Sequence, residues 1–103
     1  MDTSIVGVGV GITDRFRSVV EEKVSRIEHL APRANALEVK VTHRSYRNGR
    51  MEDDTVELTL DGKGPVVRAE ATDTDKFAAL DLAVDKISEQ VLSLIHISEP
   101  HET

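Results

Sequence analysis

The chain has 103 residues, which suits one small domain with a single hydrophobic core and leaves no room for a large enzyme fold. Hydrophobic residues make up 39% and charged residues 31%, a composition typical of soluble globular proteins and not of disordered or fibrous ones. Aromatic residues are only 3%, with no Trp, which argues against a nucleic-acid surface built on base stacking.

Charge is distributed unevenly along the chain. Thirteen Lys and Arg against nineteen Asp and Glu give a net charge of −6, which by itself argues against a polyanionic partner. However, residues 40–50 carry four bases and no acid, whereas residues 52–61 carry five acids and no base. The charge is therefore patterned, and its total is a weak guide to the partner.

The compartment is predicted from cysteine usage and from the N-terminus. The absence of cysteine excludes disulfides, thiolate metal sites and Cys nucleophiles, and it suits a reducing compartment. The first residues lack the basic stretch of a signal peptide, and no apolar run approaches the roughly 20 residues of a membrane helix. We therefore predict a cytoplasmic protein.

The first predicted element is a strand over residues 5–12. Apolar residues alternate there with glycines, and the side predicted to be covered holds Val6, Val8, Val10 and Ile12. The G-x-G-x-G spacing differs from the G-x-G-x-x-G of a dinucleotide-binding loop, and no acidic residue closes a second strand about 20 residues later. We interpret the glycines as relief of the backbone at an edge or a bulge.

A helix is predicted next, from residue 14 to about residue 30. Thr13 is a suitable N-cap, Asp14 favours the positive end of the helix dipole, and Pro32 ends the element. Apolar residues recur at helical spacing, namely Phe16, Val19, Val20, Val24, Ile27 and Leu30. Lys23 falls within this apolar arc, so that it either extends over the core edge or offers its ammonium group to a partner.

Three strands and a second helix follow. Alternation predicts strands over residues 37–44, 55–60 and 66–71, with His43 as an inward or edge residue, and Asn48-Gly49 predicts a hairpin between the first two. The helix is capped by Asp73, Thr74 or Asp75. Its apolar stripe consists of Phe77, Leu80, Val84, Ile87 and Val91.

The predicted fold class is α+β, with the order βαβββα. Because both helices must bury an apolar stripe, we expect them on one face of a four-stranded, mostly antiparallel sheet, an arrangement like that of a double-stranded-RNA-binding domain. The other face of the sheet is expected to stay polar.

Residues 92–103, LSLIHISEPHET, lack the charged amphipathic pattern of the predicted helix before them. The run is similar to the translated read-through of a widely used sequencing-library transposon adapter, from which the final His-Glu-Thr departs. We therefore expect the natural domain to occupy residues 1–91 and residues 92–103 to be a non-native tail, outside functional reasoning.

Three segments carry a resemblance to a known family, and they are TDRFRSVVEEKVSRIEHL at 13–30, DGKGPVVRAEA at 61–71 and DKFAALDLAVDKI at 75–87. Over about residues 4–91, the chain resembles the N-terminal domain of the ribosome hibernation-promoting factor family. The second segment is closest to the long form, in which a linker and a C-terminal dimerisation domain follow. That domain is absent here, so pairing of ribosomes is not expected of this chain.

The resemblance implies a translation inhibitor that is not an enzyme, needs no cofactor, and binds the small (30S) ribosomal subunit and its 16S rRNA in the channel of messenger and transfer RNA. Basic helix side chains of the family face RNA phosphates, and the matching residues are Lys23, Arg26 and Lys86, with Arg15, Lys76 and Arg33 as additions. Such contacts do not depend on base sequence, so the scarcity of aromatics is no objection.

The chain departs from the family pattern in three respects. Phe77 stands where the family often has Tyr, Lys76 where an apolar residue is common, and the second helix lacks a terminal Lys/Arg cluster. Because each lost phosphate contact weakens binding, we expect weaker ribosome binding than in an intact relative.

Each candidate residue also has a structural interpretation. The basic residues of the helices can simply form a solvated surface. The bases of residues 40–50 can discourage pairing of a strand edge with another strand. The acidic residues 52–54 are expected in a solvated hairpin loop that binds no metal. His29 and His43 lack a Ser or Cys partner, which makes a small hydrolase a remote third class. The competing class is a small acidic protein-binding regulatory module that uses the open sheet face or a sheet edge.

Overall fold

A computed structural model describes the backbone of residues 1–45 and 52–98, with side chains through residue 94. The elements are β1 (Asp2–Val8), α1 (Asp14–Leu30), β2 (Ala34–Ser45), β3 (Glu52–Gly62), β4 (Val67–Asp73) and α2 (Lys76–Ser98). The predicted βαβββα order is confirmed. The predicted Asn48-Gly49 turn lies outside the described residues.

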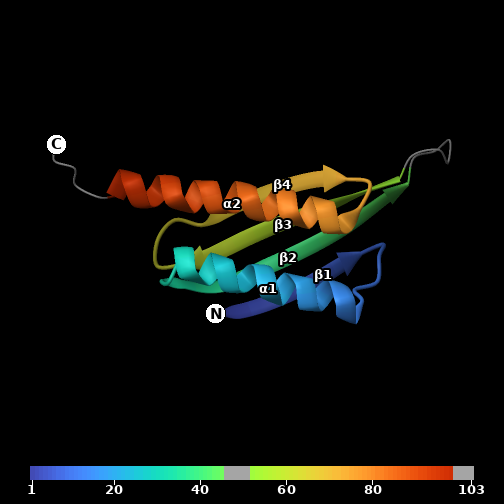
Figure 1. Cartoon of the computed structure of the whole chain (residues 1–103), viewed down its shortest axis with the longest axis horizontal. Helices are drawn as coiled ribbons and strands as arrows, with labels where there is room; N and C mark the ends of the chain where they lie inside the picture. Colours follow the sequence, from blue (N-terminus) through green and yellow to red (C-terminus); the bar gives the residue numbers. More distant parts are fainter. Residues whose placement is uncertain (46–51, 99–103) are drawn as a thin grey trace.

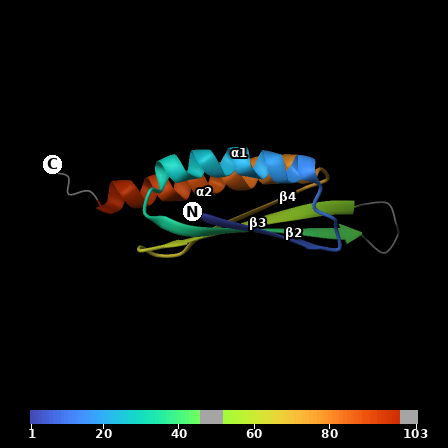
Figure 2. The ribbon, with the colours of Figure 1, turned by 90° about the horizontal axis from the view of Figure 1, so that it is seen from below.

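The four strands form one sheet in the order β1-β2-β3-β4 (Figure 1). β1 is parallel to β2, whereas β2 with β3 and β3 with β4 are antiparallel, so the prediction of a mostly antiparallel sheet is confirmed. Both helices cover one face of the sheet (Figure 2). We call the uncovered side the open face.

The core lies between the helices and the sheet. Its members come from the predicted stripes: Phe16, Val20, Val24 and Ile27 of α1, Leu37, Val39, Val41, Val56, Leu58, Leu60, Val67, Ala69 and Ala71 of the strands, and Ala79, Leu80, Ala83, Val84, Ile87 and Val91 of α2. Alternation along the strands and helical spacing along the helices place these residues on single faces. This burial is the main stabilising contribution to the fold.

Both helices begin at side-chain caps. The Phe16 backbone N–H donates to Thr13 Oγ1 at 3.1 Å, as predicted, and α1 ends before Pro32. Of the three candidates for α2, Asp75 is the cap, since its Oδ1 accepts from the Phe77 backbone N–H at 3.0 Å. A capped donor would otherwise remain without a helical partner.

The prediction for the first strand was wrong in range and in facing. β1 ends at Val8, because Gly9 turns the chain with a φ of 72°, a conformation that favours glycine. Ile5 pairs with Val39 and packs on the core, whereas Val6 pairs with Lys40 and is exposed on the open face. The turn then redirects Val10 and Ile12 toward the core, outside any strand.

The prediction of a solvated loop at residues 52–54 was also wrong. These acids are the first residues of β3 and pair with Ser45, Arg44 and His43 of β2. Asp54 is 8% exposed, and its carboxylate contacts the His43 imidazole. An acidic residue can occupy a strand here because a basic partner lies beside it.

The helix α2 continues past Val91 to Ser98. Leu94 is half-buried and packs against the core, so the helical spacing of the stripe extends three residues into the expected tail. Among the described residues, no helix is both long and apolar enough to cross a membrane.

Candidate nucleic-acid interface

The candidate bases are positioned by the two helices, which run side by side in the same direction and begin at the same end of the domain (Figure 1). The strand directions impose this parallel arrangement, because α1 follows β1, α2 follows β4, and β1 and β4 run in the same direction. The positive ends of both helix dipoles therefore lie at one end of the molecule, where they favour anions.

Arg15 and Lys76 meet at this end. The Arg15 guanidinium lies 5.3 Å from the centroid of the Phe77 ring, and Lys76 Nζ lies 5.3 Å from the same centroid and 5.9 Å from that of Phe16. The two rings pack edge to face at 5.4 Å between centroids. Cation–π contacts hold the two charges over an aromatic pair, and we call this region, to which both helices contribute, the basic end. Asp14 and the N-cap Asp75 lie in the same turns and offset part of its charge.

Lys23 faces the second helix. Its Nζ lies 2.7 Å from Asp81 Oδ1, and its side chain is 23% exposed against 59% for Asp81. The position of Lys23 within the apolar arc thus carries its ammonium group across the α1–α2 seam. The ion pair joins the helices and partly neutralises the charge that the family resemblance assigned to RNA.

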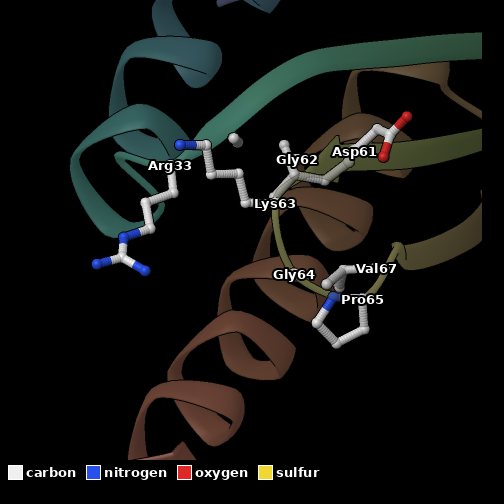
Figure 3. A pocket seen from close by; sticks show the side chains of 9 residues that line it. Arg33, Asp61, Gly62, Lys63, Gly64, Pro65 and Val67 are labelled. Carbon is white, nitrogen blue, oxygen red and sulfur yellow. The ribbon is translucent and has the colours of Figure 1, made fainter.

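Arg26 and Arg33 lie further along the chain. Arg26 is exposed on α1. Arg33, beyond the end of α1, lines a hollow of about 90 Å³ together with Lys63 of the β3–β4 turn (Figure 3). Sequence reasoning missed Lys63, since only the packing of the turn against the end of α1 brings the two bases together.

Lys86 lies along the outer edge of β4. Its Nζ donates to the Glu70 backbone carbonyl at 3.0 Å, and Gln90 Nε2, one helical turn on, donates to the Arg68 carbonyl at 2.7 Å. Outward carbonyls of an edge strand need such partners or water. Lys86 therefore has a structural partner at the sheet edge, away from the α1–α2 seam.

The six predicted bases consequently lie at four places. The structure brings Arg15 and Lys76 together at the basic end, and places Lys23 and Arg26 along α1, Arg33 beside Lys63, and Lys86 against β4. Contact of any of them with RNA stays a prediction.

A separate polar cluster surrounds His43, near the end of β2 and the start of β3. Its Nδ1 lies 2.6 Å from Asp54 Oδ1 and its Nε2 lies 3.2 Å from Glu52 Oε1. The hydrogen bond with Asp54, above all, raises the pKa of His43 above 6.5, against a smaller lowering by burial. Among the side chains that the structure describes, those of residues 1–45 and 52–94, no group of three or more potential metal ligands has suitable geometry.

Comparison with known proteins supplies the family. The family described as "Sigma 54 modulation protein / S30EA ribosomal protein" matches this chain over residues 3–94. The ribosome hibernation promotion factor of Mycobacterium tuberculosis is 36% identical over 85 residues, which are 82% of this chain and 39% of that protein. The ribosome hibernation promoting factor of Azotobacter vinelandii is 34% identical over 92 residues, which are 89% of this chain and 80% of that protein.

Solved structures agree with the fold. A ribosomal subunit interface protein from Coxiella burnetii superposes with a TM-score of 0.79 at 20% identity, covering 93% of this chain and 99% of that one. The N-terminal domain of Protein Y from Thermus thermophilus gives a TM-score of 0.69 at 32% identity, covering 88% and 96%. The chain spans about two fifths of the Mycobacterium tuberculosis relative, so it corresponds to part of that longer protein.

The family match over residues 3–94 includes the first turns of both helices and the Lys23–Asp81 ion pair between them. The chain therefore belongs to the Sigma 54 modulation protein / S30EA ribosomal protein family, in which it is similar to ribosome hibernation factors.

Proposed function

We propose that this domain acts in the cytoplasm as a ribosome hibernation factor, binds the small (30S) ribosomal subunit in the channel of messenger and transfer RNA, and inhibits translation without catalysing a reaction. Family membership supports the general role. The observation that carries the finer proposal is the basic end, where Arg15 and Lys76 converge over Phe77.

The basic end suits the phosphates of 16S rRNA for three reasons. Two cations from different helices can contact neighbouring phosphates, the aromatic pair restricts their motion, and the helix dipoles have the same sign there. Arg26 extends the surface along α1, while Lys23 shares its charge with Asp81 and contributes chiefly by fixing the helix seam. The net charge of −6 confines RNA binding to such local basic surfaces.

We further propose that residues 1–91 carry the ribosome-binding surface, and that α2 residues up to Leu94, which packs against the core, complete the same domain. Pairing of two ribosomes, which the family resemblance ascribes to a C-terminal dimerisation domain, is not proposed for it. The domain then acts by occupying the channel, and its effect on translation needs one copy per subunit.

The test is co-sedimentation of the chain with purified 30S subunits across a salt series. The variant Arg15→Glu/Lys76→Glu reverses both charges of the basic end. Its matched control, Lys40→Glu/Arg68→Glu, makes the same change in net charge at two exposed positions of β2 and β4. Circular dichroism verifies that both variants fold.

We expect the wild-type chain to pellet with 30S subunits at low salt and to be released as salt rises, because phosphate contacts release counterions. The basic-end variant should bind about tenfold or more weakly, with a salt slope reduced by about 1.4 to 1.8 for two lost contacts. Equal losses in both variants would contradict the assignment of the basic end. Absence of pelleting by the wild-type chain at low salt would contradict the function.

A further inference from the structure

The outer edge of β1 is unpaired among the described residues. β1 lies at the end of the sheet and pairs only with β2. Its sequence, DTSIVGV, has one charged residue, Asp2, and contains no Lys or Pro that would discourage a further strand. An edge of this kind exposes backbone donors and acceptors that an extended segment can pair with.

The opposite edge of the sheet is protected. Lys86 and Gln90 of α2 donate to the outward carbonyls of Glu70 and Arg68 in β4. β4 also carries three charged residues, Arg68, Glu70 and Asp73, whereas β1 is neutral after its first residue. The fold therefore blocks strand addition at one edge and leaves the other available.

Two apolar side chains mark the available edge. Val6 is 42% and Val8 is 44% exposed, and both lie on the open face, beside Lys40 and Thr42 of β2. β-branched side chains of an added strand, placed directly opposite, would cover them. Burial of this exposed apolar surface would stabilise the added strand.

An acidic hollow lies at the other end of β1. It measures about 260 Å³, and its charged lining residues are Asp2, Glu38 and Asp61, with no base among them. Because Asp2, Ser4, Val6 and Val8 follow one face of the strand, the edge passes from acidic to apolar within seven residues.

We propose that the β1 edge is a docking surface for an extended segment of a partner protein, with Lys or Arg facing the Asp2 end and β-branched residues facing Val6 and Val8. This surface is separate from the helix layer and goes beyond the proposed RNA contact. The acidic hollow, the apolar pair and the unprotected backbone edge together specify this occupant.

The geometry also sets the orientation of the charges. An added strand lies about 4.8 Å from β1 and about 10 Å from β2, which a Lys side chain and Glu38 can span between them. A base placed opposite Val6 would instead approach Lys40, its partner on β2. A second copy of this chain brings the same acids and a net charge of −6, so it lacks the complementary charge.

The experiment titrates the ¹⁵N-labelled full chain with two peptides, Lys-Thr-Lys-Thr-Val-Thr-Val and its reverse, because the added strand can be parallel or antiparallel. Peptides with Glu in place of Lys are the charge control. The variant Val6→Lys/Val8→Lys replaces the apolar pair. Val66→Lys/Leu82→Lys is its matched control, since it adds the same charge at exposed positions, one in the β3–β4 connection and one on α2.

We expect one basic peptide to shift the amide signals of β1 and to slow their hydrogen exchange. Val6→Lys/Val8→Lys should raise Kd at least tenfold, and the matched control should leave Kd within about twofold of the wild type. Asp2→Asn/Glu38→Gln should raise Kd about threefold and flatten its salt dependence, a result that holds even if the valine variant fails to fold.

Three results would overturn the proposal. The first is the absence of β1 shifts at millimolar peptide. The second is equal binding of the Glu peptides, which removes the charge argument. The third is a β1 shift that depends on the concentration of the chain alone, which would make a second copy the occupant.

Discussion

At the scale of single residues, the surroundings of His43 favour the protonated form of its imidazole. Both ring nitrogens face carboxylate oxygens, at 2.6 Å for Asp54 and 3.2 Å for Glu52. A neutral imidazole has one N–H, so it can donate to only one of them, whereas imidazolium donates to both. The raised pKa of His43 follows from this arrangement, with the Asp54 hydrogen bond as its largest cause.

The first prediction concerns pH. Since the folded pKa of His43 is raised above 6.5, its contribution to stability is complete below pH 6.5 and is lost as pH rises through the folded pKa. We expect the melting temperature of the wild type to fall over that interval, and His43→Gln to remove this part of the fall. Thermal unfolding by circular dichroism at a series of pH values measures it.

His29→Gln is the control, because it changes a histidine on an exposed turn of α1 and keeps the His43 pair intact. If the melting temperatures of the wild type and of His43→Gln change with pH in the same way, the two carboxylates do not stabilise the protonated imidazole in solution.

The second prediction concerns the Lys23–Asp81 ion pair. The partial exposure of both side chains limits its value, so Asp81→Lys should lower the free energy of unfolding by about 1 kcal/mol, part of it through repulsion between two ammonium groups. Lys23→Asp/Asp81→Lys restores opposite charges and should recover most of the loss. Urea denaturation of four chains, the wild type, the single variants Lys23→Asp and Asp81→Lys, and the double variant, gives the coupling energy.

The same four chains separate a structural role of Lys23 from RNA contact. If the seam is its role, the charge-swapped chain binds 30S subunits as the wild type does. Recovery of stability without recovery of binding would instead place Lys23 on the ribosome.

At the scale of elements, α1 depends on its first turn. The Thr13 hydroxyl satisfies the Phe16 backbone N–H, and Phe16 in turn is completely buried and supports the ring of Phe77. A frayed first turn would therefore disturb both the core and the position of Arg15 at the basic end. The cap connects a local sequence signal to the candidate interface.

The third prediction follows from this cap. Thr13→Ala should lower the free energy of unfolding by about 1 kcal/mol, because the Phe16 N–H loses its acceptor. Thr13→Ser keeps the hydroxyl and should cost only a few tenths of a kcal/mol. Urea unfolding measures both, and equal losses would mean that the threonine methyl group, and not the hydrogen bond, is what matters.

At the scale of the whole molecule, the two edges of the sheet and the two ends of the helix layer differ in character. One edge is protected by α2 and the other is bare, while the helix layer has a basic end at Arg15 and Lys76 and a second pair of bases, Arg33 and Lys63, near the end of α1. These differences would let one small domain present both the proposed RNA-binding surface and the proposed strand-binding edge.

The fourth prediction concerns the extent of the domain. Leu94 packs against the core, and the family match runs to residue 94, whereas the sequence alone suggested an end at residue 91. A chain that ends at residue 94 should unfold at the same temperature as the full chain. A chain that ends at residue 91 should lose about 1 kcal/mol with the Leu94 contacts, and equal stability of the two shortened chains would support the end at residue 91.

The order of elements, the core outside β1 and the α1 cap were determined by the sequence itself, because each depends on neighbours within a turn or along a strand. Alternation identified Val39, Val41 and Leu58 as core residues, and Thr13 was recognisable as a cap. The motif resemblance likewise identified the family. The elements and the Thr13 cap follow from local spacing and the family from the resemblance of three segments, so neither needed coordinates.

What the tertiary structure decided are the contacts between residues far apart in the chain. Lys23 and Asp81 lie 58 positions apart, and no local pattern pairs them. The facing of β1 depended on the turn at Gly9 and on its register with β2, and a shift of one residue exchanges the two faces. The pairing of His43 with Asp54, the meeting of Arg15 with Lys76 and the bare edge of β1 likewise arise only when strands and helices pack together.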